Sequence, residues 1–211
     1  DVYKRQGQCM TYGDGDGTSY TALTSLDIVG HEITHGLTEH TSNLEYASES
    51  GALNESFSDI FGVAIVFYKH PGTANWLNGE QTSLAGEAFR NMSNPNQYQN
   101  PDTYHGLYWD PAEEVHCNSG VQNFWFYLLT SGGTGVNDNG DNYSVTGIGI
   151  SKAEQIAYRN LSVYLTQYSD YSDARFYAIQ SAIDLYGACS AEVISTTNAW
   201  QAVGIGNVFS N

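Results

Sequence analysis

Residues 50–68 constrain the fold of this 211-residue chain more than any other segment. Apolar side chains recur there every three or four positions until "HPG" at 70–72 ends the pattern, which predicts a helix buried on most sides. Glu55 and Asp59 lie within that pattern, and a buried carboxylate is costly without a partner cation or several hydrogen bonds. We therefore expect both acids to face a cation. The apolar positions are Leu53, Phe57, Ile60, Phe61, Ala64, Ile65 and Tyr68.

The motif "HEITH", from His31 to His35, supplies groups that can share a cation with these acids. Residues four apart lie one above the other on a helix, so both imidazoles point to one place, and Glu32 can reach a water bound to a metal there. Catalytic zinc takes three protein ligands and leaves a fourth position for water. Glu55 can be the third ligand, on a helix that returns antiparallel to the first. Asp59 is then placed to accept the second ring N–H of a liganding histidine.

The remaining pattern predicts a mainly α-helical fold. Asp27 is predicted to cap the zinc-binding helix, and Ser151 and Glu154 are predicted to form a capping box at a later helix. Four helices are expected after the first two, within residues 118–133, 151–165, 172–187 and 190–204.

The polar segments between these helices predict loops. Residues 72–118 are too long and irregular for a simple connection, which is typical of a functional loop region. The Gly- and Asp-rich segments 13–17 and 135–149 are interpreted as surface turns in preference to ion sites. No internal repeat or linker is visible, so residues from about 25 onward are predicted to form one helical unit.

The charge balance excludes some partners. Asp and Glu number 23 against 7 Lys and Arg, a formal net charge of −16, which repels nucleic acid and anionic membranes. No segment reaches the roughly 20 apolar residues of a membrane-spanning helix. Sixteen tyrosines and few lysines are typical of a secreted protein, and we expect a monomer. Cys9, Cys117 and Cys189 lack a C-x-x-C arrangement, so we expect at most one disulfide and no cysteine zinc site.

Several segments together resemble the thermolysin family of secreted zinc metalloendopeptidases. They are "DIVGHEITHGLTEHTSNLEYASESGALNESFSDIFG", "FRNMSNPNQYQNPDTY", "EEVHCNSGVQNFWFYLL", "VTGIGISKAEQIAYRNL" and "LYGACSAEVISTTNAWQAVG". The likeness extends from Met10 to about Gly206. It implies that residues 27–211 comprise the zinc-binding helix and a thermolysin-like C-terminal helical domain. Residues 1–26 would be a short remnant of a β-rich N-terminal domain.

The resemblance also implies roles for individual residues. One catalytic zinc would be held by His31, His35 and Glu55, with Asp59 behind the ligands. Glu32 would be the general base that takes a proton from the zinc-bound water and passes it to the leaving amine. The substrate would be a peptide or protein with a bulky apolar residue on the amine side of the cleaved bond. The oxyanion donors would be Tyr46 and His116, Arg90 would hold a substrate carbonyl, and the specificity pocket would be lined by Tyr20, Leu23, Ile28 and Phe89.

Two departures from the family pattern affect the substrate cleft. Val2 and Tyr3 stand where the family has an Asn-Ala motif on an edge strand that binds the substrate backbone. The acid that orients the catalytic histidine has no clean equivalent. Asp110, Glu113 and Glu114 all precede His116, and their spacing does not choose among them.

A third departure concerns calcium. Asp27, Asn75 and Glu80 match calcium-ligand positions of the family, whereas Val66 and Leu77 replace carboxylates. Fewer carboxylates compensate less of the charge of two close divalent ions. We therefore expect at most one weak calcium site.

Three functions compete at this point. The leading hypothesis is a zinc endopeptidase. The second is a peptide-binding module with weak or no catalytic activity, in which zinc has only a structural role. It is expected if the N-terminal half of the cleft is absent. The third is a zinc aminopeptidase, which would need an acidic anchor for the substrate amine; no motif for such an anchor is recognised.

Overall fold

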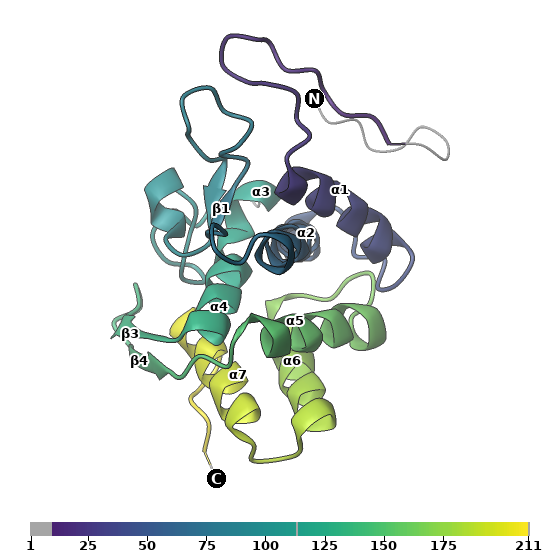
Figure 1. Cartoon of the computed structure of the whole chain (residues 1–211). Coiled ribbons are helices and arrows are strands. Elements are labelled where there is room, and N and C mark those ends of the chain that lie inside the picture. The colour runs from purple at the N-terminus through teal and green to yellow at the C-terminus, as the bar shows by residue number, and fades with distance from the viewer. Residues whose placement is uncertain (1–9, 113, 211) are drawn as a thin grey trace.

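The computed structural model describes residues 10–112 and 114–210. This part is mainly α-helical, with two short antiparallel sheets, as predicted (Figure 1). The helices are α1 (Leu26–Glu39), α2 (Ser48–Lys69), α3 (Val115–Asn118), α4 (Gly120–Ser131), α5 (Ile150–Arg159), α6 (Tyr171–Tyr186) and α7 (Ala191–Ala202), with a 3-10 turn η1 (Pro95–Tyr98) and a π-helical turn η2 (Asn160–Tyr164). The strands are β1 (Leu77–Asn78), β2 (Arg90–Asn91), β3 (Gly133–Val136) and β4 (Asn142–Val145).

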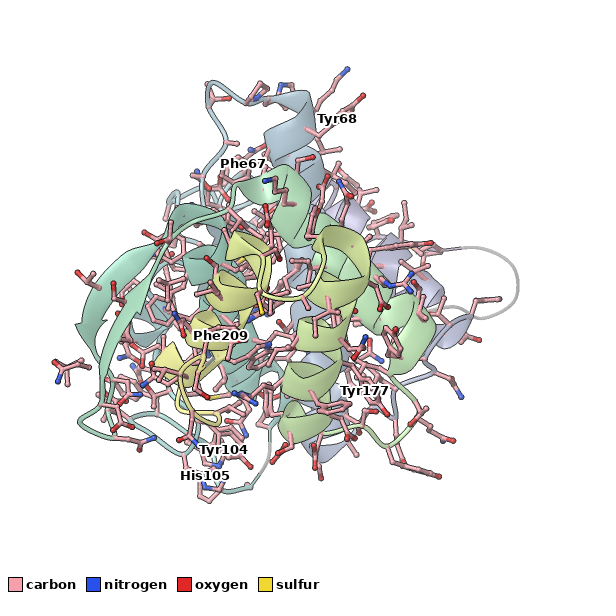
Figure 2. All side chains as sticks on the ribbon, turned by 90° about the horizontal axis from the view of Figure 1, so that it is seen from below. Phe67, Tyr68, Tyr104, His105, Tyr177 and Phe209 are labelled. Carbon is pink, nitrogen blue, oxygen red and sulfur yellow. The ribbon has the colours of Figure 1, made fainter. Side chains whose placement is uncertain are left out.

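Helix α2 is the central element, because it packs against α1, α4, α5 and α6. Its side chains are buried around most of its circumference, as its apolar pattern predicts. Phe67 near its end packs on Trp76, whereas the next residue, Tyr68, points outward and is 88% exposed (Figure 2). Trp125 of α4 and Trp200 of α7 stack at 4.8 Å to continue the core away from α1.

Helices α1 and α2 cross at a pair of glycines. Gly30 of α1 faces Gly62 of α2, and a Cβ on Gly62 would lie 2.5 Å from the carbonyl oxygen of Asp27. Figure 1 looks down α2 while α1 runs across the view, so the predicted antiparallel return is wrong. Because neither glycine has a side chain, the two helices cross closely. The close crossing brings side chains of α1 next to Glu55 and Asp59 of α2.

The prediction that Asp27 caps α1 is also wrong. The cap position is Ser25, and its side chain makes no capping hydrogen bond. Asp27 lies in the first turn, 4% exposed, and its Oδ2 accepts a hydrogen bond of 2.5 Å from the backbone N–H of Gly79. The Asp27 carboxylate therefore accepts from a distant loop instead of capping the start of α1.

The predicted capping box of α5 does not form. This helix begins at Ile150 after Gly149, whose φ of 80° makes the turn into it, so Ser151 already lies inside the helix. A capping box is instead present at α6, where Asp170 and Asp173 bond reciprocally to each other's backbone N–H. The segment 135–149 also departs from a plain loop, because it contains the end of β3 and all of β4, which pair from Gly133↔Val145 to Val136↔Asn142.

Residues 19–21 pair with the loop between β1 and β2. Tyr20 and Ser83 form an isolated antiparallel bridge, and the N–H of Thr21 donates to the carbonyl of Thr82 at 2.8 Å. The division of the chain at residues 26 and 27 stays a prediction. Val2, Tyr3, Cys9 and Glu113 lie outside the described residues.

Two further expectations concern the surface and the thiols. Among the described helices, none has the length and apolar character needed to cross a bilayer. Cys117 and Cys189 carry free thiols in the structure.

Candidate metal centre

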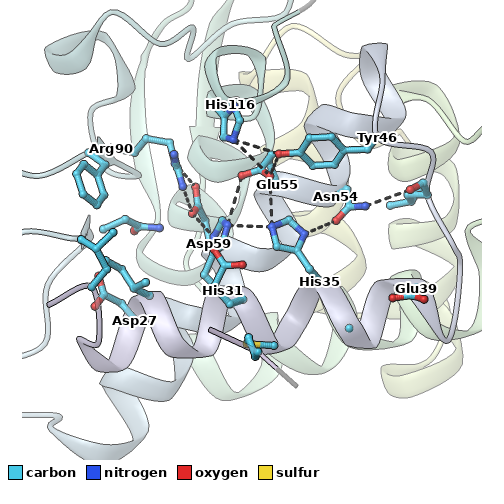
Figure 3. A pocket seen from close by; sticks show the side chains of 18 of the residues that line it. Asp27, His31, His35, Glu39, Tyr46, Asn54, Glu55, Asp59, Arg90 and His116 are labelled. Carbon is cyan, nitrogen blue, oxygen red and sulfur yellow. Dashed lines mark hydrogen bonds and ion pairs between the residues drawn. The ribbon is translucent and has the colours of Figure 1, made fainter. Parts of the chain in front are cut away.

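Two histidines of α1 face each other at the crossing with α2 (Figure 3). His31 and His35 are one turn apart, and their Nε2 atoms lie 3.1 Å from each other. The two rings are edge to face, with centroids 4.7 Å apart. Two nitrogens at this separation can both ligate one ion placed between them.

Glu55 of α2 completes a three-sided arrangement with these rings. Its Oε2 lies 3.4 Å from Nε2 of His31, and its Oε1 lies 3.3 Å from Nε2 of His35. Tetrahedral zinc, with bonds of about 2.0–2.1 Å, holds its ligand atoms about 3.3–3.4 Å apart. Within the described chain, the buried Oε2 has no hydrogen-bond partner, which a metal would supply. The residues present therefore fit a zinc ion.

The opposite ring nitrogens are held by different acceptors. Nδ1 of His31 contacts Oδ1 of Asp59 at 2.9 Å, and Nδ1 of His35 contacts Oδ1 of Asn54 at 2.7 Å. Asn54 is itself anchored, because its amide donates to the carbonyl of Leu44 at 3.1 Å. With each Nδ1 as the donor, both Nε2 lone pairs point toward Glu55.

Asp59 is the most heavily bonded acid of the centre. Arg90 donates to it through Nε at 2.6 Å and Nη2 at 2.7 Å, and the amide of Asn123 donates at 2.8 Å. Burial raises the pKa of the Asp59 carboxyl, but the Arg90 guanidinium and the His31 ring hold it well below its ordinary range. Asp59 is therefore a permanent negative charge behind His31.

Neighbouring charges also shift the pKa values of His31 and Glu55, which face each other. Burial lowers the pKa of His31, but the hydrogen bond to Asp59 and the nearby charge of Glu55 outweigh burial and raise it to about 9. Burial also opposes ionisation of Glu55, yet the adjacent His31 and His35 rings hold its pKa well below its ordinary range. The centre thus favours a cation, whether proton or metal.

Tyr46 and His116 lie on the other side of Glu55. The Tyr46 hydroxyl hydrogen bonds to Oε1 of Glu55 and lies 3.1 Å from Nε2 of His116. Burial and the charge of Glu55 raise the pKa of Tyr46 well above its ordinary value, so the hydroxyl keeps its proton. Glu114 contacts Nδ1 of His116 at 2.6 Å, whereas Asp110 accepts from the backbone N–H of Glu114. Among the described acids, Glu114 is therefore the one that orients His116.

These groups open into a cleft of about 1000 Å³ that runs along α1. Glu32 faces it, with a carboxylate oxygen within 4.8 Å of the ligand nitrogens of His31 and His35. Five carboxylates line the cleft against the single guanidinium of Arg90, which already contacts Asp59. The carboxylates of Glu32 and Glu55 and the ring nitrogens of His31 and His35 thus share one acidic cleft.

Comparison with known proteins agrees with this arrangement. Residues 42–205 match the family model described as thermolysin metallopeptidase, alpha-helical domain, and residues 4–39 match the one described as thermolysin metallopeptidase, catalytic domain. The chain belongs to the thermolysin family. The two matches meet between α1 and α2, where the first two candidate ligands and the third lie on opposite sides.

Individual members of the family are similar over most of this chain. Bacillolysin of Bacillus cereus is 46% identical over 94% of this chain and 35% of its own length. Thermolysin of Alicyclobacillus acidocaldarius is 44% identical over 94% of this chain and 36% of its own length. The solved structure of the precursor of protealysin, a metalloproteinase from Serratia proteamaculans, superposes with a TM-score of 0.78 at 29% identity, covering 96% of this chain and 64% of that one. The chain thus spans about a third of the length of these curated relatives.

The apolar end of the thermolysin-like cleft includes three of the four predicted pocket residues. Leu23, Ile28 and Phe89 line it. Tyr20 does not line the cleft; its ring packs on that of Phe89 at 5.5 Å, with the planes inclined by 40°. Tyr20 therefore contacts a residue of the cleft wall without lining the cleft itself.

The predicted calcium residues lie together next to β1. Asn75 donates to Oε1 of Glu80 at 3.1 Å, and Asp27 binds the backbone of Gly79, the neighbour of Glu80. Asp27 Oδ1 and Glu80 Oε2 are buried without a hydrogen-bond partner in the described part of the chain. These oxygens fit the oxygen preference of calcium, and a single weak site stays a prediction.

Sequence reasoning did not single out Asn54 or Asn123. Asn54 directly precedes Glu55, and this adjacency to a predicted ligand was the available signal. Asn123 lies on α4, 64 residues from Asp59, and no local pattern marks it.

Proposed function

We propose that this chain is a zinc-dependent endopeptidase. The observation that carries the proposal is the convergence of Nε2 of His31, Nε2 of His35 and the Glu55 carboxylate, at 3.1–3.4 Å from one another, on a cleft that also presents Glu32. Three ligands with an open side are typical of catalytic rather than structural zinc. Bound zinc supplies Lewis-acid activation of water near neutral pH.

Proton transfer in this proposal belongs to Glu32. Its carboxylate lies within 4.8 Å of the ring nitrogens, close enough to take a proton from a water attacking a peptide carbonyl beside them. The protonated Glu32 then gives that proton to the amine that leaves when the C–N bond breaks. The carboxylate is regenerated, so the cycle closes without another base.

Tyr46 and His116 stabilise the negative charge that develops on the carbonyl oxygen. Tyr46 keeps its proton as a donor, and it must leave Glu55 to reach the oxyanion. Glu114 contacts Nδ1 of His116 and so turns Nε2, which we assign as the second donor, toward the Tyr46 hydroxyl. Arg90 contacts Asp59 through Nε and Nη2, so Nη1 is the atom that we assign to a substrate carbonyl.

The apolar end of the cleft sets the preference for the residue after the cleaved bond. Leu23, Ile28 and Phe89 offer apolar surface and no charge there. A bulky apolar side chain gains by leaving water at that position. We therefore assign cleavage on the amino side of such residues.

A fluorogenic peptide with a bulky apolar residue after the scissile bond tests this proposal. The zinc-loaded chain should cleave it, and Glu32→Gln should abolish turnover while zinc content stays at one per chain. Asp141→Asn is the matched control, because it makes the same carboxylate-to-amide change at an exposed turn between β3 and β4. Equal turnover by the parent chain and Glu32→Gln would contradict the proposed mechanism.

A second candidate is a noncatalytic peptide-binding module in which the zinc is structural. It is favoured by the hydrogen bond of the Tyr46 hydroxyl to Glu55, which occupies one of the two proposed oxyanion donors. Binding of one zinc and of the same peptide, with no turnover by the parent chain, would select this candidate.

The proposal also includes the cofactors, the substrate class and the location of the protein. We assign one catalytic zinc, at most one weak calcium, and a peptide or protein substrate. A net charge of −16 disfavours nucleic acid, and the composition favours an exported protein, which we take to be a monomer.

A further inference from the structure

One buried oxygen of the cleft has no role in the function proposed above. Among the described residues that line the cleft, Asp27, Glu55 and Asn78 each have a buried side-chain oxygen without a hydrogen-bond partner. The Glu55 oxygen is assigned to zinc, and the Asp27 oxygen belongs to the predicted calcium position. Asn78 is 5% exposed, and its Oδ1 is assigned to neither ion. Most buried polar groups in proteins have a partner, so this exception needs an explanation.

The side chain of Asn78 shares one face of a small sheet with Arg90. The two residues are paired directly between β1 and β2, so their side chains project from the same side of the ladder, with Cβ atoms about 4.5–5.5 Å apart. Arg90 extends into the cleft and contacts Asp59 (Figure 3). Asn78 also lines the cleft. Its amide therefore lies beside the guanidinium that we assign to the substrate backbone.

The neighbours of Asn78 belong to the apolar end of the cleft. The N–H of Phe89 donates to the backbone carbonyl of Asn78 at 2.8 Å. The Phe89 ring lies against Gly79, which donates its N–H to Asp27 in the first turn of α1. Ile28 follows Asp27 and lines the same end. The Asn78 amide is thus an uncharged polar group in a mainly apolar pocket.

The side chain that enters this pocket decides whether the amide is satisfied. A plain phenyl ring would exclude water from Asn78 and offer no hydrogen bond, which leaves a desolvated polar group. A hydroxyl at the tip of the ring can donate to Oδ1 or accept from Nδ2, so it suits either orientation of the amide. A site that hydrogen bonds a substrate hydroxyl discriminates against the analogue that lacks it.

We propose that Asn78 is a specificity-determining residue that selects tyrosine directly after the scissile bond. This inference rests on the proposed endopeptidase function, because that function places the residue after the bond in the apolar pocket. It narrows the preferred side chain from a bulky apolar one to an aromatic one with a hydroxyl at its tip.

Three peptides with blocked termini test this inference. They differ only in the residue after the scissile bond, which is tyrosine, phenylalanine or 4-fluorophenylalanine. The fluorine takes up space similar to that of the hydroxyl but carries no proton to donate, so it controls for size. The parent chain should cleave the tyrosine peptide with a kcat/KM about tenfold above that of either other peptide, as for one hydrogen bond made out of water. Equal values for all three would overturn the inference.

Substitutions at Asn78 assign the preference. Asn78→Leu replaces the amide by an apolar side chain of similar size, so the tyrosine peptide should lose its advantage. Asn142→Leu is the matched control and should keep the parent ratio, because it makes the same change at an exposed position of β4 outside the cleft. If Asn78→Leu does not fold, as judged by its zinc content, Asn78→Val makes the test with a side chain favoured in strands.

Other results would contradict this role of Asn78. A tyrosine preference that is unchanged in Asn78→Leu would overturn the inference. Loss of bound calcium in Asn78→Leu with an unchanged peptide ratio would also overturn it, because Oδ1 would then belong to the calcium position.

Failure of the proposed function gives a different result. If the parent chain cleaves none of the three peptides, the endopeptidase proposal fails, and their dissociation constants for the zinc-loaded chain still test Asn78. Tighter binding of the tyrosine peptide that disappears in Asn78→Leu would support the inference. Equal binding of all three peptides to the parent chain would overturn it.

Discussion

Two aspartates in this molecule receive similar sets of donors in different surroundings. Asp59 at the metal centre accepts from Arg90, His31 and Asn123, and its side chain is fully buried. Asp184 on α6 accepts from Arg159, Tyr164 and Gln180, and its side chain is 25% exposed. In both cases the donors lower the pKa of the carboxyl.

The difference between these clusters shows what burial adds. At Asp184, water and salt screen the charges and can replace any lost partner. The Asp59 side chain is fully buried, so each donor left without its acceptor carries the full desolvation penalty. The buried cluster therefore fixes the position of His31, whereas the exposed cluster only links side chains on the surface between α5 and α6.

The largest expected effect comes from removing the charge of Asp59. Asp59→Asn leaves the buried guanidinium of Arg90 uncompensated and weakens the hold on His31. Loss of one partner of a buried ion pair typically costs about 3–5 kcal/mol of unfolding free energy. Loss of a partner of a metal ligand lowers metal affinity about 10–100-fold. Urea denaturation with a chelator present, and zinc titration, measure the two effects separately.

The exposed cluster supplies the matched substitution. Asp184→Asn should leave zinc affinity unchanged and shift the urea midpoint far less than Asp59→Asn. Equal losses of stability in the two variants would remove the distinction between the clusters.

A smaller effect is expected from Asn123. Asn123→Ala removes the amide that donates to Asp59 at 2.8 Å and accepts from the Ser56 hydroxyl at 2.8 Å. An unsatisfied buried polar group costs about 1–3 kcal/mol. Zinc affinity should fall less than in Asp59→Asn, because His31 keeps its carboxylate. Ser56→Ala, which removes only the outer partner, is the control for a merely structural loss.

The contact between Asp27 of α1 and the loop after β1, which contains Glu80, represents an intermediate case, because buried oxygens of both acids lack hydrogen-bond partners among the described residues. At most one weak calcium is expected there, so its binding adds little stability. Chelating calcium while zinc stays bound should lower the melting temperature by only a few degrees. Unfolding of the whole chain on that treatment would refute the prediction.

The smallest expected effect is the pH dependence at Asp184. Its donors lower the pKa from its ordinary value to about 2. A carboxyl with a lowered folded pKa stabilises the fold above its unfolded pKa of about 3.9, and the contribution disappears as the pH falls through about 2. Any difference in urea midpoint between the parent chain and Asp184→Asn that comes from this charge should therefore be full at pH 5–7 and should fall toward zero as the pH is lowered through about 2. A difference that persists unchanged near pH 2 would show that Asp184 acts through something other than its charge.

The same contrast explains what the sequence could predict. His31 and His35 were predictable because their spacing is local, and Glu55 and Asp59 were predictable because acids stand out in an apolar helical pattern. The family resemblance added Tyr46, His116 and Arg90, which no local pattern connects. The mainly α-helical class followed from periodicity and is confirmed.

The errors and omissions share one cause, which is contact between distant segments. Asp27 bonds to Gly79, 52 residues away, and so does not cap α1. The crossing of α1 and α2 depends on Gly30 meeting Gly62, and neither glycine indicates a partner by itself. Asn123 reaches Asp59 from another helix. Such pairings become visible only when the chain is folded.

The ligand set of the metal centre is the central claim, and zinc-edge X-ray absorption of the zinc-loaded chain tests it most directly. The spectrum should fit two imidazoles, one carboxylate and one further light atom, with no sulfur, and Glu55→Gln should change the oxygen shell. A sulfur ligand, which Cys117 beside His116 would supply, or a spectrum unchanged in Glu55→Gln, would contradict the assignment.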